Sequence, residues 1–311
     1  MGLTKRSLGG LLLGGILGSR FFVLIHASKK RIAKESRQNL MWEEGRAMGY
    51  RYETHLHTKE VSACGHTHAK DYIKFYKERG YDGIIFTDHF FNGNCGIPRN
   101  LPWEERIDAF CRGYELAKEE GDRTGLLVLF GWEFNFEGDE YLTYGLDKGW
   151  LRAHPEIMED TREEYYRRVH GAGGLVVQAH PYRERGYLNA VRLNPYFVDA
   201  VEYINIGNEP YMDELVLEYA KRYGLPMTGG TDMHNIEWGQ TPSGIETKEK
   251  LTCIGDFVRL VRSGKGFLPI IVSGRRENTA RERYLVVMKY GRDGRFTLCE
   301  NGEELAGEED R

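Results

Sequence analysis

The stretch GIIFTDH, residues 83–89, is a short apolar run of β-branched and aromatic residues that ends in Asp88 and His89. Such a run is typical of a strand buried on both faces, as in a parallel sheet. The same form recurs in GLLVLFGWEF (125–134), GLVVQAH (174–180), AVEYIN (200–205) and PMTGGTD (226–232), and YRYETHL (50–56) reads as a further strand. We therefore expect a sheet of several parallel strands.

Helical patterns lie between these strands, at about 102–120, 161–172, 210–223 and 247–264. A further helix should begin near Thr67, whose spacing to Asp71 indicates a helix N-terminus, and should stop at Gly80. Alternating strands and helices predict an α/β fold, either a barrel or a doubly wound sheet.

The chain of 311 residues is long enough for one large α/β domain or two modest ones. We divide it into an apolar and basic leader (1–47), a barrel (48–270) and a C-terminal β-hairpin with an acidic tail (271–311), the hairpin turning at GRDGR. Three readings of the leader stay open: a secretory signal, a membrane anchor, or a translation start assigned upstream of Met41 or Met48. Membrane association would involve only residues 1–30.

The net charge of −4 gives no reason to expect long nucleic acid as a partner. The five cysteines are odd in number and form no CxxC pair, which argues against a disulfide framework and against a zinc ribbon. A reducing compartment fits this pattern. We expect a cytoplasmic protein, or an anchored or exported one if the leader is genuine.

Polar residues fall where the predicted strands end. These are His55-Leu56-His57-Thr58, Thr87-Asp88-His89, Trp132-Glu133, Ala179-His180-Pro181 and Asp232-Met233-His234. In a βα barrel the carboxyl ends of the strands converge on one mouth, and residues two apart on a strand share a face. Imidazole and carboxylate together suit zinc, manganese or iron(II). A single histidine at a strand end is usually a surface residue, but this series predicts a shared metal site.

With these motifs in this order, residues from about 50 to 240 resemble the PHP (polymerase and histidinol phosphatase) superfamily. The resemblance implies a distorted (β/α)7 barrel with a di- or trinuclear metal centre in its mouth, here extended by a short C-terminal β segment. It also implies hydrolysis of a phosphoester by a metal-bound hydroxide.

The resemblance also implies a set of metal ligands. His55, His57, Glu133 and Asp232 would hold one ion, Glu133 would bridge to a second ion held by His180, and His66, His89 and His234 would hold a third. The family usually has one more histidine on the strand after the bridging glutamate. In GDEYLTYGL that position reads as Tyr141, which leaves two or three ions (zinc, manganese or iron) as the expectation.

Three residues are candidates for catalysis. Glu133 would set the spacing of the ions, and Asp88 would support a ligand or act as a base. Arg183, with Arg185 nearby in HPYRER, would bind the phosphate through its guanidinium. A basic loop exposed to solvent would explain the same residues equally well. Glu202 is a neighbour of uncertain role.

Two other polar residues of the stretch 55–68 are not expected to bind metal. His68 reads as a bystander at a helix start, and Cys64 as a structural cysteine.

The sequence therefore predicts a metal-dependent phosphoesterase that acts on a small phosphomonoester or on a nucleotide or short oligonucleotide. The alternatives are a hydrolase of a non-phosphate substrate such as a cyclic amide, and a non-catalytic metal-binding module. Oligomeric state stays open.

Overall fold

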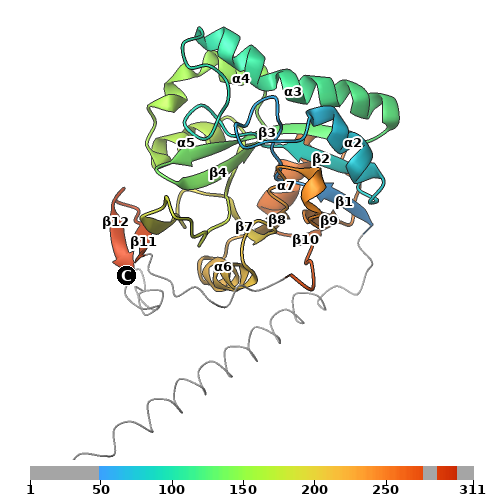
Figure 1. Cartoon of the computed structure of the whole chain (residues 1–311). Helices are drawn as coiled ribbons and strands as arrows, with labels where there is room; N and C mark the ends of the chain where they lie inside the picture. Colours follow the sequence, from blue (N-terminus) through green and yellow to red (C-terminus); the bar gives the residue numbers. More distant parts are fainter. Residues whose placement is uncertain (1–48, 276–285, 300–311) are drawn as a thin grey trace, which may run out of the picture. The chain divides into compact units, whose positions relative to one another are not determined.

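A computed structural model describes residues 49–275 and 286–299 (Figure 1). The predicted leader, the linker 276–285 and the acidic tail lie outside these residues. The predicted division at residue 47 therefore stays a prediction. Within the described part of the chain, no helix combines the length and hydropathy that crossing a membrane requires.

The main sheet has nine strands in the order β10-β9-β1-β2-β3-β4-β5-β7-β8. Their bounds are β1 Tyr50–Glu53, β2 Gly83–Phe86, β3 Leu127–Phe136, β4 Asp139–Tyr144, β5 Leu175–Gln178, β7 Ala200–Asn205, β8 Met227–Gly230, β9 Ile245–Thr247 and β10 Phe267–Pro269. The predicted α/β class and barrel-like sheet are confirmed. The sheet is mixed, however, because β4 runs antiparallel to β3 and β5, and β9 runs antiparallel to β1 and β10.

The end strand β8 approaches β1 in the segments that follow the two strands. Leu56 and Met233 form a parallel bridge, and the His57 amide donates to the Met233 carbonyl at 2.8 Å. The Asp232 amide donates to the His55 carbonyl at 2.8 Å. These bonds join the segment after β1 to the segment after β8, so the sheet nearly closes at the strand ends that carry the predicted ligands.

The helices are α2 Ala69–Lys77, α3 Trp103–Thr124, α4 Lys148–Ala153, α5 Arg162–Gly171, α6 Pro210–Tyr223 and α7 Ile254–Ser263, with 3₁₀ turns η1 Pro155–Met158 and η2 Ile236–Trp238. The α6 helix follows expectation, since Pro210 stands at its start and Gly224, with φ 63°, ends it.

One predicted helix start is wrong, and the capping role predicted for Thr67 is not seen. The helix expected over 247–264 begins at Ile254, because residues 245–247 pair with β1 as strand β9. The N-cap of α2 is His68, which makes no side-chain capping bond. The hydroxyl of Thr67 instead accepts from the Ile236 amide.

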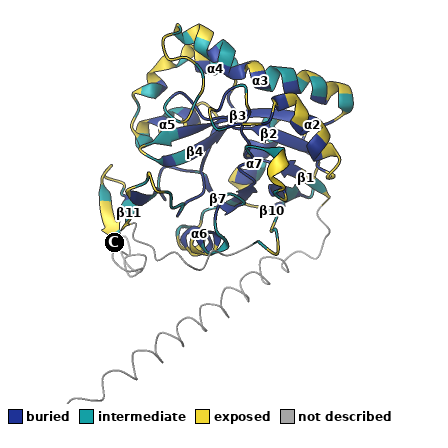
Figure 2. Cartoon of the chain, in the orientation of Figure 1, coloured by how far each residue is buried: buried dark blue, intermediate teal, exposed yellow. Residues whose placement is uncertain are grey.

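The strands are buried as their composition predicts, whereas the outer helices alternate buried and exposed faces (Figure 2). The interior of the barrel contains Tyr52, Leu142, Tyr144 and Val177, and the Tyr144 hydroxyl donates to the Thr54 carbonyl across it. This apolar filling lies below the polar residues at the strand ends.

The predicted C-terminal hairpin is confirmed: β11 (Val286–Tyr290) and β12 (Phe296–Cys299) are antiparallel and turn at residues 291–295. The strand β11 also pairs in parallel with β6 (Ala190–Leu193), a strand that no sequence pattern indicated. This small sheet holds the far end of the loop that carries Arg183 and Arg185.

Candidate metal centre

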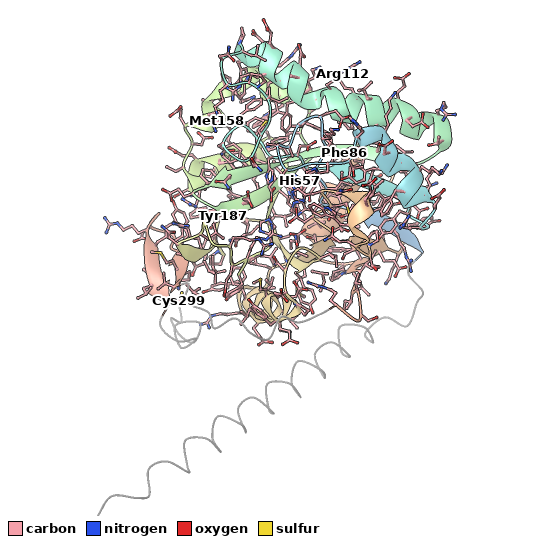
Figure 3. The ribbon with its side chains drawn as sticks, in the orientation of Figure 1. His57, Phe86, Arg112, Met158, Tyr187 and Cys299 are labelled. Carbon is pink, nitrogen blue, oxygen red and sulfur yellow. The ribbon has the colours of Figure 1, made fainter. Side chains whose placement is uncertain are left out.

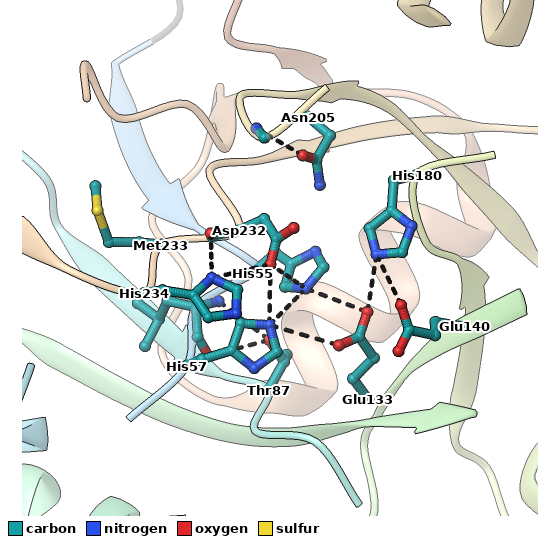
Figure 4. A network of polar contacts seen from close by, with 12 residues as sticks. His55, His57, Thr87, Glu133, Glu140, His180, Asn205, Asp232, Met233 and His234 are labelled. Atoms are coloured by element: carbon teal, nitrogen blue, oxygen red, sulfur yellow. Dashed lines mark hydrogen bonds and ion pairs between the residues drawn. The ribbon is translucent and has the colours of Figure 1, made fainter. Parts of the chain in front are cut away.

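The strand ends bring seven of the eight predicted ligands together (Figure 4). Every strand of origin ends at the same mouth, as parallel strands do in a barrel. The ligands come from the segments after β1 (His55, His57), β2 (His89), β5 (His180) and β8 (Asp232, His234), and from β3 itself (Glu133). All but His234 are buried.

Four of these side chains converge on one point. The Nε2 atoms of His55 and His57 lie 3.1 Å apart, and Oδ1 of Asp232 lies 3.3 Å and 3.0 Å from them. The carboxylate of Glu133 lies 3.4 Å from His55 Nε2 and 3.5 Å from His57 Nε2. Lone-pair-bearing atoms this close, away from water, are stabilised by a shared positive charge.

These distances fit a bound divalent ion. Zinc binds imidazole nitrogen and carboxylate oxygen at about 2.0–2.2 Å, so two ligands of a tetrahedral site stand about 3.4 Å apart. Two further atoms, His89 Nδ1 and Glu133 Oε2, are buried without a hydrogen-bond partner among the described residues. They lie 2.8 Å apart but without the angles of a hydrogen bond. The residues present therefore fit a centre of divalent metal ions.

Three of these histidines also make a hydrogen bond through the ring nitrogen that faces away from the centre. His55 Nδ1 contacts Glu202 Oε1 at 2.9 Å, His57 Nδ1 contacts the Ser62 hydroxyl at 3.2 Å, and His234 Nδ1 contacts the Asp232 carbonyl at 2.8 Å. With a proton on each of these Nδ1 atoms, the Nε2 lone pair would face the centre, which is how metal-binding histidines are usually oriented.

Glu202 is thus more than a neighbour. Its Oε1 faces His55, and its Oε2 accepts from the His180 amide at 3.0 Å and from the Asn205 side chain at 2.8 Å. One buried carboxylate therefore orients two candidate ligands.

Asp88 points into the loop after β1 rather than into the centre. It accepts from the Thr58 amide at 2.6 Å, the Thr58 hydroxyl at 2.8 Å and the Ser62 hydroxyl at 2.6 Å. Because Ser62 also contacts His57, Asp88 acts on that ligand through one hydroxyl. These contacts suit the supporting role expected of Asp88, while a role as base stays a prediction.

The electrostatics of the centre keep its carboxylates charged. Burial would raise the pKa of Glu133, but His89 and His55 hold that pKa well below its usual range. Burial would likewise raise the pKa of Asp232, which Arg183 and His55 hold well below its usual range. Burial lowers the pKa of His57 well below its ordinary value, which favours the neutral imidazole that binds metal.

The backbone is strained at two candidate ligands. His180 (φ 29°) and Asp232 (φ 56°) adopt positive φ, a conformation that costs energy for residues with a side chain. Gly230 precedes this turn, and a Cβ there would stand 2.4 Å from Glu202 Oε1 and 2.5 Å from His55 Cβ. The chain thus bends at the points where the side chains must turn inward.

His66 is the predicted ligand that the structure does not bring into the cluster. It is exposed, and its ring is tilted against Trp238 with centroids 5.7 Å apart. Its neighbour Cys64 lies closer to the centre. Burial raises the pKa of the Cys64 thiol, but contacts with His234 and His89 lower it to about 6. His68 is exposed and pairs with Glu60 at 3.0 Å, as expected of a bystander.

The sequence reasoning missed Glu140. Tyr141, taken as the replacement for the family histidine, faces away from the centre and donates its hydroxyl to Asp139 at 2.6 Å. Glu140, one residue earlier, lies 3.5 Å from His180 Nε2. The period-2 alternation with Leu142 and Tyr144, both inside the barrel, was the signal that could have identified it.

A cavity of about 750 Å³ opens above the centre. Arg183 reaches it from the β5–β6 loop, with Nη2 2.6 Å from Asp232 Oδ2 and 2.9 Å from Asn205 Oδ1, and Nε 2.9 Å from Asn208 Oδ1. Arg185, Tyr187, His66 and Trp238 line the same cavity. Figure 3 labels His57 among the inner side chains and Tyr187 on the side of β11 and β12.

No protein-family model and no curated protein sequence matches this chain. Among solved structures, a proposed metal-dependent phosphoesterase from Bifidobacterium adolescentis is 19% identical, with a TM-score of 0.43, over 71% of this chain and 98% of its own. A Bacteroides vulgatus two-domain protein containing a predicted PHP-like metal-dependent phosphoesterase is 14% identical, with a TM-score of 0.47, over 71% of this chain and 64% of its own.

A third structure is an amidohydrolase from Chromobacterium violaceum with bound sulfate and no metal. It is 14% identical, with a TM-score of 0.44, over 70% of this chain and 98% of its own. At such identities and TM-scores, the chemistry of this chain has to be argued from its own side chains.

Proposed function

We propose that this protein is a metal-dependent phosphoesterase of the PHP type. The observation that carries the proposal is the convergence of His55, His57, Glu133 and Asp232 within 3.0–3.5 Å, with the far nitrogens of both rings tied from outside. Such a donor set, at the bottom of an open cavity, supports hydrolytic chemistry. Two or three divalent ions (zinc, manganese or iron) would occupy it.

Bound divalent ions would supply Lewis acidity toward a phosphoryl oxygen and would acidify a water molecule. The chain itself holds the substrate. In Arg183, Nε donates to Asn208 and Nη2 donates to Asn205 and Asp232. Its Nη1 makes no hydrogen bond to the described residues. Nη1 is therefore the guanidinium donor left for a phosphate oxygen, while the ion pair fixes both Arg183 and Asp232.

The substrate we infer is a small phosphorylated molecule, either a phosphomonoester or a nucleotide or short oligonucleotide. The exposed rings of Tyr187 and Trp238 at the cavity support a planar leaving group, since aromatic side chains stack on bases. The net charge of −4 gives no support for long nucleic acid.

Hydrolysis of a cyclic amide is the second candidate, because the same Lewis acidity polarises a carbonyl oxygen. Arg183 favours the phosphoester, since a guanidinium in the cavity suits an anionic substrate. A non-catalytic metal-binding module would need none of the open space above the centre.

A substrate panel with added manganese or zinc tests the proposal on the full chain, using phosphomonoesters, phosphodiesters and cyclic amides. We expect phosphoester turnover that His57→Ala and Asp232→Ala each reduce to background, with circular dichroism unchanged. His68→Ala is the matched control, because His68 belongs to the same stretch but is exposed. Full activity of His57→Ala, or turnover of amides alone, would contradict the proposal.

A further inference from the structure

We propose that Glu140 is itself a metal ligand and supplies a carboxylate where the motif pattern led us to expect an imidazole. With Glu133, His89 and His180 it would form a second ion subsite beside the one at His55 and His57. The inference shares the metal centre of the proposed function but concerns ion binding rather than the reaction.

The geometry around Glu140 suits an ion. Glu140, His89 and Glu133 each present one ligand atom, and these atoms lie within 4.8 Å of one another. Oε2 of Glu140 lies 3.5 Å from His180 Nε2, and Oε1 lies 3.7 Å from His89 Nδ1. Figure 4 shows Glu140 and Glu133 turned toward the same ring of His180.

Two buried atoms at this subsite face each other at 2.8 Å and make no hydrogen bond to the described residues. They are His89 Nδ1 and Glu133 Oε2, on side chains that are 10% and 1% exposed. A buried polar atom without a hydrogen bond destabilises the fold unless another group compensates it. An ion between Glu133, His89 and Glu140 would give both atoms a partner at once.

The position of Glu140 follows from the β3–β4 pairing. Asn135 lies opposite Glu140 in the register and donates from its side chain to Oε1 at 3.0 Å. Asn135 is itself fixed, because its carbonyl accepts from the Asn92 side chain at 2.6 Å. Asn135 therefore positions the carboxylate and leaves Oε2 to face His180.

Glu140 also has a simpler reading. It lines the cavity with Arg183, so its charge would balance the guanidinium without touching an ion. The two readings differ in what the ions do when Glu140 changes. A ligand sets ion number and affinity, whereas a charge-balancing residue leaves the number unchanged.

The test is metal binding by the full chain. Apo-protein is titrated with Mn²⁺ or Zn²⁺, and bound ions are counted by mass spectrometry after dialysis. We expect Glu140→Gln to lose about one ion per chain. The affinity of that subsite should fall at least tenfold, since even residues behind the ligands typically contribute about 10–100-fold. Glu137→Gln is the matched control, because Glu137 lies three residues away on the same hairpin and its side chain is 73% exposed.

A second variant keeps the test decisive if Glu140→Gln folds poorly. Glu140→His restores an imidazole and should keep the ion, but with its preference shifted from Mn²⁺ toward Zn²⁺ by about tenfold or more, since nitrogen ligands favour zinc and oxygen ligands favour manganese. Wild-type ion number and affinity in both variants would overturn the inference. A wild-type protein that binds ions but hydrolyses no phosphoester would refute the proposed function and leave this inference intact.

Discussion

The floor of the cavity and its rim are built in different ways. The floor (His55, His57, Glu133, Asp232) comes from strand ends, and its side chains are at most 5% exposed. The rim (His66, Arg185, Tyr187, Trp238) comes from the segments that connect the strands, with Tyr187 76% and Trp238 58% exposed. The barrel thus fixes what binds the ions, and the connections between its strands decide what else enters.

We expect the largest loss of metal affinity from removing a residue that contacts a floor ligand on the side away from the ions. Glu202→Gln replaces an oxygen that faces His55 Nδ1 with a group that can point a donor at it. We expect metal affinity to fall about 10–100-fold, measured by titration with Mn²⁺. Glu246→Gln is the control, since Glu246 pairs with the half-exposed Arg51 on β1. Unchanged affinity in Glu202→Gln would mean that strand geometry alone orients His55.

Arg183 joins the floor to the rim, so its substitution should have an intermediate effect. Arg183→Lys keeps the charge but loses the planar fork that reaches Asp232 and Asn205 together. We expect kcat/KM for a phosphoester to fall about tenfold, mostly through KM, with ion number unchanged; tenfold corresponds to about 1.4 kcal/mol. Arg192→Lys on β6 is the control. Loss of ions with KM unchanged would mean that Arg183 stabilises the ion site and does not bind the substrate.

Rim residues should have the smallest effect and should depend on the substrate. Trp238→Ala removes an exposed ring whose plane lies 15° from that of His234. We expect KM for a phosphoester with an aromatic leaving group to rise about three- to tenfold, from the about 0.5–1.5 kcal/mol of an aromatic pair. KM for an aliphatic phosphomonoester should stay constant. An equal change for both substrates would assign Trp238 to support of His234 instead.

The floor could be predicted from sequence because its signal is local. Most of the apolar runs end in or beside a histidine or an acid, and strand ends in a barrel share one mouth. His55 and His57, or Asp232 and His234, are two residues apart and therefore point alike. Strand ends and the two-residue period thus indicated seven candidate ligands at one mouth, and the resemblance implied their roles.

The remaining site residues could not be placed from sequence, because their positions depend on tertiary contacts. Glu202 sits in mid-strand, and only the fold turns it behind His55. His66 follows the motif but lies outside the cluster, since its amide donates to the His234 carbonyl while its ring faces Trp238. Glu140 and Tyr141 differ by one residue, and in a strand one residue decides the face.

The central claim is that the floor holds divalent ions, and anomalous X-ray diffraction from crystals grown with Mn²⁺ tests it most directly. We predict one peak among His55, His57 and Asp232, and a second between Glu133 and Glu140. Crystals of protein saturated with Mn²⁺ that show no anomalous peak within bonding distance of His57 or Glu133 would contradict the account.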